Sequence, residues 1–187
     1  MSGPEVVHRA GEQAKRLVSR FFRPHFSIPP GTDWALPVLP GLVNGVGDLA
    51  GTSELVDSWK VAATRLQEGR LVFFGTEWPK LGGPEKWHID PISGRVWSPI
   101  TYCFRVPYRY VPDYGDVKYV WELNRLQHLQ PVAALAAVTE DSDLGVLCAE
   151  ELESWIDSNP PFNGVNWASG IELALRIVSI IILTSLI

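Results

Sequence analysis

Polar and aromatic side chains interrupt a helical pattern between Trp121 and His128. Four of them recur at the spacing i, i+3, i+4 and i+7 and therefore share one helix face: Trp121, Asn124, Arg125 and His128. Glu122 can form an ion pair with Arg125 on the same helix. An indole, an amide, a guanidinium group and an imidazole on one face suit a polyhydroxylated ligand that carries a carboxylate, because arginine binds carboxylates through two parallel hydrogen bonds. An exposed helix whose polar residues are incidental is the alternative interpretation.

A second group of polar residues lies between Asn159 and Arg176. Asn166 is predicted to cap the start of a helix in which Glu172 and Arg176 form an ion pair one turn apart. That helix is otherwise apolar, so its charges must be paired or must face a cleft. The two alternatives are a wall of a polar cleft and an ion pair that only joins neighbouring helices.

The loop from Trp87 to Trp97 carries a turn signature between two tryptophans. Asp90 is followed directly by Pro91, and Gly94 comes three residues later. Asp, Pro and Gly in this order favour a tight turn. Taken alone, the segment is therefore predicted to be a packing loop.

Helices must position these three groups of residues. Apolar residues near one stripe predict a helix over residues 116–139, which Pro131 is expected to kink or divide. A second helix is predicted over residues 143–157, and a third from about Ala168 to the end of the chain. Helices joined by short polar loops, without intervening strands, predict a mainly α fold built from antiparallel helical hairpins.

The N-terminal half is predicted to be long, irregular and rich in Trp and Pro, with two helices. Residues 6–21 form an amphipathic helix, whose basic face either contacts an anionic surface or is simply solvated. Proline and glycine are expected to exclude regular structure from there to about residue 52, and Ser53 can cap the next helix, which stops at Gly69. We therefore predict a lead-in at residues 1–52 and a helical domain at residues 53–187.

Two further segments of this half have their own predictions. The short apolar run over residues 71–74 predicts a strand without an evident partner. The connection over residues 76–113 is unusually long for a loop, and its many tryptophans predict that it packs on the helices.

Composition limits the partners of the chain. Its 187 residues carry 21 acidic and 16 basic side chains, without a basic stripe that could bind a phosphate backbone, so no nucleic-acid partner is expected. The two cysteines lack the spacing of zinc ligands, and no metal or cofactor is predicted. The uncharged stretch Ile177 to Ile187 is shorter than the about 20 residues that span a bilayer, which predicts a core helix and no membrane span.

In this order and spacing, the three groups resemble hallmark motifs of the N-terminal domain of the heparinase II/III family of polysaccharide lyases. The matching segments are Trp87 to Trp97 (Trp-x-x-Asp-Pro-x-x-Gly-x-x-Trp), Trp121-Glu-Leu-Asn-Arg125, and Asn159 to Arg176. The resemblance covers about residues 70–182. It implies an incomplete (α/α) toroid, which is a ring of helical hairpins around a cleft. It also implies cofactor-free β-elimination at the uronic acid residues of an acidic polysaccharide.

By the same resemblance, catalysis belongs to residues that this sequence does not contain. The family assigns it to an Asn-His segment, a Tyr on later helices of the toroid and a further His. No Asn-His pair occurs here, and all five tyrosines lie upstream of that position. We therefore assign no catalytic residue and expect a truncated portion that is inactive alone. The candidate substrate-contacting residues form a cleft wall, to which His128 is added from its helix position: Trp121, Glu122, Asn124, Arg125, His128, Asn166, Trp167, Glu172 and Arg176.

Two other functions stay open at this point. One is a noncatalytic carbohydrate-binding domain that uses the same cleft, and the other is a structural helical scaffold. The family implies a periplasmic location, although the N-terminus lacks the apolar core of a signal peptide. The last helix would expose four apolar residues unless it folds back, which predicts self-association: Ile177, Ile180, Ile181 and Leu183.

Overall fold

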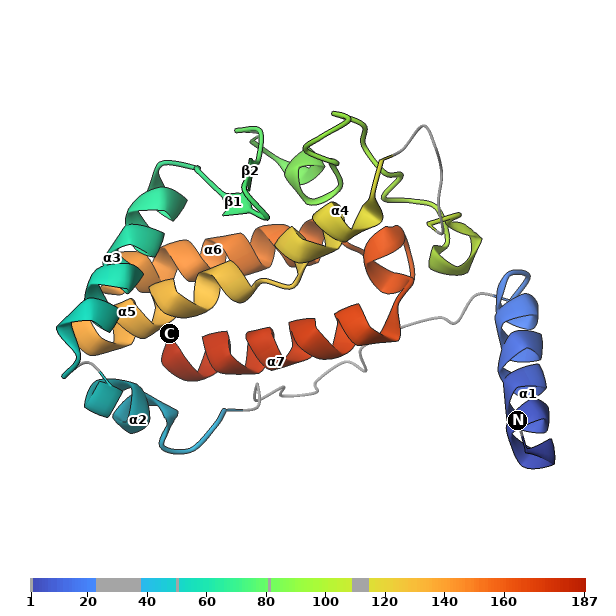
Figure 1. Cartoon of the computed structure of the whole chain (residues 1–187), viewed down its shortest axis with the longest axis horizontal. Helices are drawn as coiled ribbons and strands as arrows, with labels where there is room; N and C mark the ends of the chain where they lie inside the picture. The colour runs from blue at the N-terminus through green and yellow to red at the C-terminus, as the bar shows by residue number, and fades with distance from the viewer. Residues whose placement is uncertain (1, 23–37, 50, 81, 109–114) are drawn as a thin grey trace, which may run out of the picture.

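The computed structural model describes residues 2–22, 38–49, 51–80, 82–108 and 115–187. The fold is mainly helical, as predicted (Figure 1). The helices are α1 (Gly3–Ser19), α2 (Leu42–Leu49), α3 (Ser53–Gln67), α4 (Val117–Asn124), α5 (Gln130–Thr139), α6 (Ser142–Ser158) and α7 (Gly170–Leu186). Much of the predicted lead-in, residues 23–37, and part of the long connection, residues 109–114, lie outside the described residues.

Helix α5 is the centre of the core. It packs against α2, α3, α6 and α7, and α6 runs opposite to α5 and α7 (Figure 1). The sequence of α5 is apolar on all sides, and five consecutive residues of this helix are buried: Val132, Ala133, Ala134, Leu135 and Ala136. A helix that is apolar all round is stable only when other elements surround it, and its small alanines let those helices approach closely.

The helix predicted over residues 116–139 is divided, as expected, but not at Pro131, and this is the first correction. The chain leaves the helical conformation at Leu126, whose φ of 59° is left-handed, and α4 therefore ends at Asn124. Pro131 lies in the first turn of α5, where a missing backbone N–H costs no hydrogen bond. The division thus occurs five residues before the proline, because burial of the Leu126 side chain holds the turn in place.

Helix α2 is the second correction, because regular structure was not expected before residue 52. Its sequence contains Gly45 and Gly47, which disfavour a helix. Val46 is nevertheless buried in the main core, Leu42 packs beside it, and α2 contacts both α5 and α7. Tertiary packing of one apolar face therefore outweighs the low helix propensity of the segment.

The remaining N-terminal predictions agree better with the structure. Helix α3 ends as predicted, and Gly69 follows it with a φ of +65°, but its N-cap is Thr52 rather than Ser53. The predicted strand is β1 (Val72–Phe73), and its missing partner is β2 (Thr76–Glu77), paired antiparallel across a turn. The tryptophans of the long connection are packed as expected, with 3%, 0% and 2% exposure at Trp78, Trp87 and Trp97.

The two terminal helices differ in how much they bury. Helix α7 folds back along α5, which is the case in which its four apolar residues were not expected to be exposed, and Leu183 is fully buried. Ile177 on the same helix is nevertheless 57% exposed. Helix α1 buries none of its residues and stands beside the main body (Figure 1). Within the described ranges, no helix is both long and apolar enough to cross a bilayer.

Candidate functional site

Two fully buried asparagines join the three groups of residues singled out above. The Asn124 Nδ2 atom donates to the Trp87 carbonyl oxygen at 2.8 Å, and Asn166 Nδ2 donates to the same oxygen at 3.3 Å. Asn166 Nδ2 also donates to Asn124 Oδ1 at 2.8 Å. The loop that begins at Trp87, helix α4 and the 3-10 helix Val165–Trp167 therefore meet around one carbonyl group.

Helix α6 closes this buried network from the other side. Trp155 Nε1 donates to Asn124 Oδ1, and Asn166 Nδ2 donates to Asn159 Oδ1, both at 2.8 Å. The sequence predicted a helix over residues 143–157 but gave no role to Trp155 within it. The residue type alone could have indicated this role, because the N–H group of a buried tryptophan usually finds a hydrogen-bond acceptor.

Arg176 lies beneath the two asparagines and is 2% exposed. Its Nε donates to the Asn124 carbonyl oxygen at 2.7 Å and its Nη1 to the Asn166 carbonyl oxygen at 3.1 Å. The guanidinium carbon also lies 4.5 Å from the centre of the Trp155 ring. Burial lowers the pKa of Arg176 to about 10, so the group stays charged at neutral pH.

These contacts correct the predicted Glu172–Arg176 ion pair. Asn124 is the last residue of α4, and its carbonyl belongs to the negative end of that helix, which lacks intrahelical partners. Arg176 satisfies this carbonyl, and no salt bridge links it to Glu172 among the described residues. The predicted cap is also wrong: Ser169 is the N-cap of α7, and the Asn166 side chain is engaged in the network.

Glu172 pairs with Arg125 instead, and thereby links α7 to α4. The contact is bidentate, with Nε to Oε2 at 2.7 Å and Nη2 to Oε1 at 3.0 Å. The predicted Glu122–Arg125 pair is confirmed, because Arg125 Nη1 also donates to Glu122. The Glu172 hydrogen bonds raise the pKa of Arg125 above its ordinary value. Two carboxylates surround one guanidinium group, so the cluster has no positive charge left over for a uronate.

His128 does not share a face with Arg125, contrary to prediction. The left-handed turn at Leu126 breaks the helical spacing and directs His128 to the other side, where its ring centre lies 5.7 Å from that of Phe73. Neither ring nitrogen has a hydrogen-bond partner among the described residues. Burial lowers the pKa of His128 to about 3, with a smaller contribution from the Lys86 charge. His128 is therefore neutral at neutral pH, and its side chain is only partly exposed.

Two predicted residues lie at the rim of the network. Trp121 and Trp167 are partly exposed, and their indole nitrogens donate to the carbonyl oxygens of Val165 and Asn159, both at 3.1 Å. The Trp121 ring also packs against Tyr108, with ring centres 5.3 Å apart. Of the nine predicted residues, these two aromatic rings offer the flat, solvent-accessible surface on which a sugar stacks.

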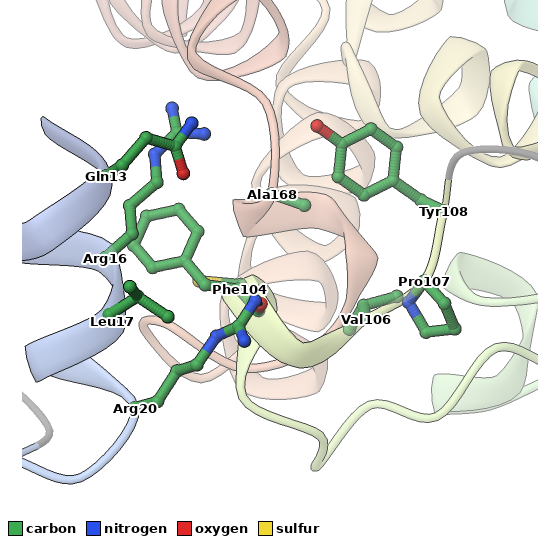
Figure 2. Close-up of a pocket in the computed structure, with 10 residues that line it drawn as sticks. Gln13, Arg16, Leu17, Arg20, Phe104, Val106, Pro107, Tyr108 and Ala168 are labelled. Carbon is green, nitrogen blue, oxygen red and sulfur yellow. The ribbon is translucent and has the colours of Figure 1, made fainter. Parts of the chain in front are cut away.

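A separate cavity of about 300 Å³ lies between α1 and the 3-10 helix Cys103–Arg105. Sequence reasoning identified the basic face of α1 but not the cavity that it borders, because the two walls are far apart in the chain. Figure 2 shows its lining: Gln13, Arg16, Leu17, Arg20, Cys103, Phe104, Val106, Pro107, Tyr108 and Ala168. The guanidinium and amide groups among these residues are of the kinds predicted for the helix face at residues 121–128, with Phe and Tyr in place of the indole and no imidazole.

The described part of the chain was also searched for side chains that could bind a metal ion. No group of three His, Cys, Asp or Glu side chains there could hold a metal ion. Comparison with models of protein families, with curated proteins and with solved structures finds no match.

Proposed function

We propose that this chain is the N-terminal portion of the (α/α) toroid of a heparinase II/III-like polysaccharide lyase. Such an enzyme cleaves an acidic polysaccharide by β-elimination at uronic acid residues. In this proposal residues 53–187 form part of the wall of the toroid, and the buried network braces the helices. The residues that the resemblance assigns to catalysis are not in this sequence, so the chain alone is inactive.

One observation carries the proposal. Asn124 and Asn166 come from two different motifs. Both side chains donate to the main-chain carbonyl of Trp87, which is the first residue of the remaining motif. The three motifs are separated by tens of residues but form one structural unit. Shared contacts of this kind give a physical reason for finding the three motifs together, since each supplies a partner that the others need.

In this proposal the substrate contacts the aromatic residues at the rim of this unit rather than its charged side chains. Arg125 is neutralised by Glu122 and Glu172, and Arg176 is buried against backbone carbonyls. Trp121 and Trp167 are only partly buried. Stacking on these rings is compatible with the acidic character of both chain and substrate, because it needs no surplus of positive charge.

A structural helical domain without carbohydrate binding is the second candidate. The observation in its favour is the burial of four of the nine predicted residues: Asn124, Asn166, Glu172 and Arg176 are each at most 4% exposed. A ligand cannot reach these groups without displacing their present partners. The noncatalytic carbohydrate-binding alternative would again depend on Trp121 and Trp167.

A chimera tests the lyase proposal. Residues 53–187 would replace the matching segment of an active heparinase II/III lyase, and the unsaturated uronate product would be followed by its ultraviolet absorbance. We expect product from a chimera that melts cooperatively. A matched chimera with Asn124→Ala should lose both stability and activity, whereas one with Asn163→Ala should keep both. A cooperatively folded chimera without activity would contradict the proposal.

The chain by itself provides a complementary measurement. Incubated with heparan sulfate, hyaluronan or alginate, it should form no unsaturated uronate. Product formation that increases in proportion to the chain would show that catalytic residues are present after all.

A further inference from the structure

We propose that the cavity between α1 and the 3-10 helix Cys103–Arg105 binds a sugar acid through its carboxylate. This site is independent of the lyase proposal, because none of the nine residues considered above lines it. Its volume of about 300 Å³ is at the lower end of the range for small-molecule sites and suits one ring-shaped ligand.

Arg16 is the group that would hold the carboxylate. Its guanidinium carbon lies 5.3 Å from the centre of the Phe104 ring, which places the group over an aromatic face at the edge of the cavity. In the described part of the chain it forms no salt bridge, unlike its helix neighbours Arg9 and Lys15, which pair with Glu5 and Glu12. Its N–H donors are thus available for a bidentate contact with an anion.

Tyr108 supplies a second donor from the opposite wall. Figure 2 shows its hydroxyl turned toward the side of the cavity on which Arg16 lies, with Ala168 between them. A guanidinium group and a neutral hydroxyl on facing walls suit a single negative charge. No carboxylate side chain occurs among the described lining residues, so an anion would not meet a like charge there.

The rest of the lining favours a sugar over a purely apolar ring. Phe104 contributes an apolar ring to the lining, and the Gln13 side chain offers both a donor and an acceptor for hydroxyl groups (Figure 2). Arg20 has a positioning role, because its Nη2 donates to the Phe104 carbonyl oxygen at 2.9 Å. Arg105 returns a bond of 2.7 Å to the Arg20 carbonyl oxygen and thereby ties α1 to this wall.

The test is an NMR titration of the full chain labelled with ¹⁵N, observing the arginine side-chain N–H signals. The ligands are glucuronate, glucose as its neutral counterpart and benzoate as a carboxylate on an aromatic ring. We expect saturable shifts with glucuronate, with a dissociation constant on the order of millimolar for so small a ligand. Glucose should cause no saturable shift, and benzoate should bind more weakly than glucuronate.

Variants locate the binding site. Arg16→Gln should weaken glucuronate binding about tenfold, the usual effect of losing a charge-assisted contact, and Tyr108→Phe should weaken it about threefold. Arg9→Gln removes the same charge from the same helix outside the cavity and should leave binding unchanged. Tyr119→Phe is the matching control for the hydroxyl, since Tyr119 packs on Phe74 and Trp78. All these side chains are at least partly exposed, so the variants should fold.

Several results would overturn the proposal. They are no saturable binding of glucuronate, equal binding of glucose, tighter binding of benzoate, and equal losses from Arg16→Gln and Arg9→Gln. None of them bears on the chimera experiment, which reports on the motif network and not on this cavity.

Discussion

Asn166 carries an unusual share of the polar contacts at the centre of this protein. Its Nδ2 atom lies within 3.3 Å of three acceptors: the Trp87 carbonyl oxygen, Asn124 Oδ1 and Asn159 Oδ1. The residue is fully buried. A buried acceptor that loses its donor retains the full cost of its removal from water, which makes this side chain sensitive to truncation.

We expect Asn166→Ala to lower the free energy of unfolding by about 2 to 3 kcal/mol, because it leaves Asn159 Oδ1 without its donor. Urea denaturation measures the change. Asn163→Ala is the control, since that side chain donates only to the Pro161 carbonyl at an exposed site and should cost about 0.5 kcal/mol or less. Equal losses in the two variants would contradict a special role for Asn166.

His128 predicts a pH dependence of stability. Its pKa is about 3 in the folded chain, against the ordinary histidine value of 6.5 in the unfolded chain, so the unfolded state binds the proton first on acidification. Stability is therefore fully present above pH 6.5 and is lost progressively as the pH falls from there toward about 3.

Replacing His128 by Phe should remove this part of the acid sensitivity while keeping a ring against Phe73. Urea denaturation at several pH values between 4 and 7 measures it, as the difference between variant and parent. His8→Gln, on the exposed face of α1, should leave the profile unchanged. The buried His88, whose pKa is also lowered by burial, is common to all three proteins and cancels in the comparison.

At the scale of single elements, α2 is a helix that its own sequence disfavours. Gly45 lies inside it, and an added Cβ there would meet nothing within 4 Å. Gly45→Ala should therefore stabilise the protein by about 0.5 to 1 kcal/mol, since alanine loses less backbone entropy on folding. Thermal or urea unfolding measures the gain.

Gly69 provides the matched opposite case. An added Cβ there also meets nothing within 4 Å, but the backbone has a φ of +65° after the end of α3. Gly69→Ala should cost about 1 kcal/mol, because the left-handed conformation is unfavourable for an L-residue with a Cβ. Stabilisation by both substitutions would show that α3 ends differently.

The break between α4 and α5 shows why element boundaries decide the site. The helical spacing of residues 121–128 places His128 beside Arg125 only if the helix is continuous. Leu126 is fully buried in the core and adopts a left-handed conformation there, which no local sequence rule predicts for leucine. The same turn ends α4 at Asn124. The Asn124 carbonyl therefore has no donor within the helix and accepts a hydrogen bond from Arg176 instead.

At the scale of the whole molecule, α7 leaves an apolar surface open. Ile171, Ile177 and Val178 are 72%, 57% and 54% exposed on one side of this helix, while Leu183 and Leu186 are buried on the other. Contiguous exposed apolar residues often mark a contact with another protein surface.

We expect the chain to self-associate through this surface. Sedimentation velocity should show a concentration-dependent increase in mass, which Ile177→Glu reduces. Ile92→Glu is the control, since Ile92 is 62% exposed but lies in the loop after Asp90. A chain that stays monomeric at all concentrations, or an equal effect of the two variants, would contradict the expectation.

The sequence by itself determined the helical class, the extents of α3, α6 and α7, and the packing of the tryptophan-rich connection. These features depend on local periodicity, on turn residues and on the cost of exposing large aromatic side chains, all of which can be read along the chain. It also singled out Asn124, Asn166, Glu172 and Arg176 as unusual, because polar residues in apolar segments need partners.

Only the tertiary structure decided which partners those are. Glu172 pairs with Arg125 across 47 positions rather than with Arg176 one turn away, and Asn166 joins a network instead of capping a helix. Helix α2 and the turn at Leu126 likewise exist because distant residues bury their side chains. Burial makes an unpaired polar group costly, so the partner that is near in space prevails over the partner that is near in sequence.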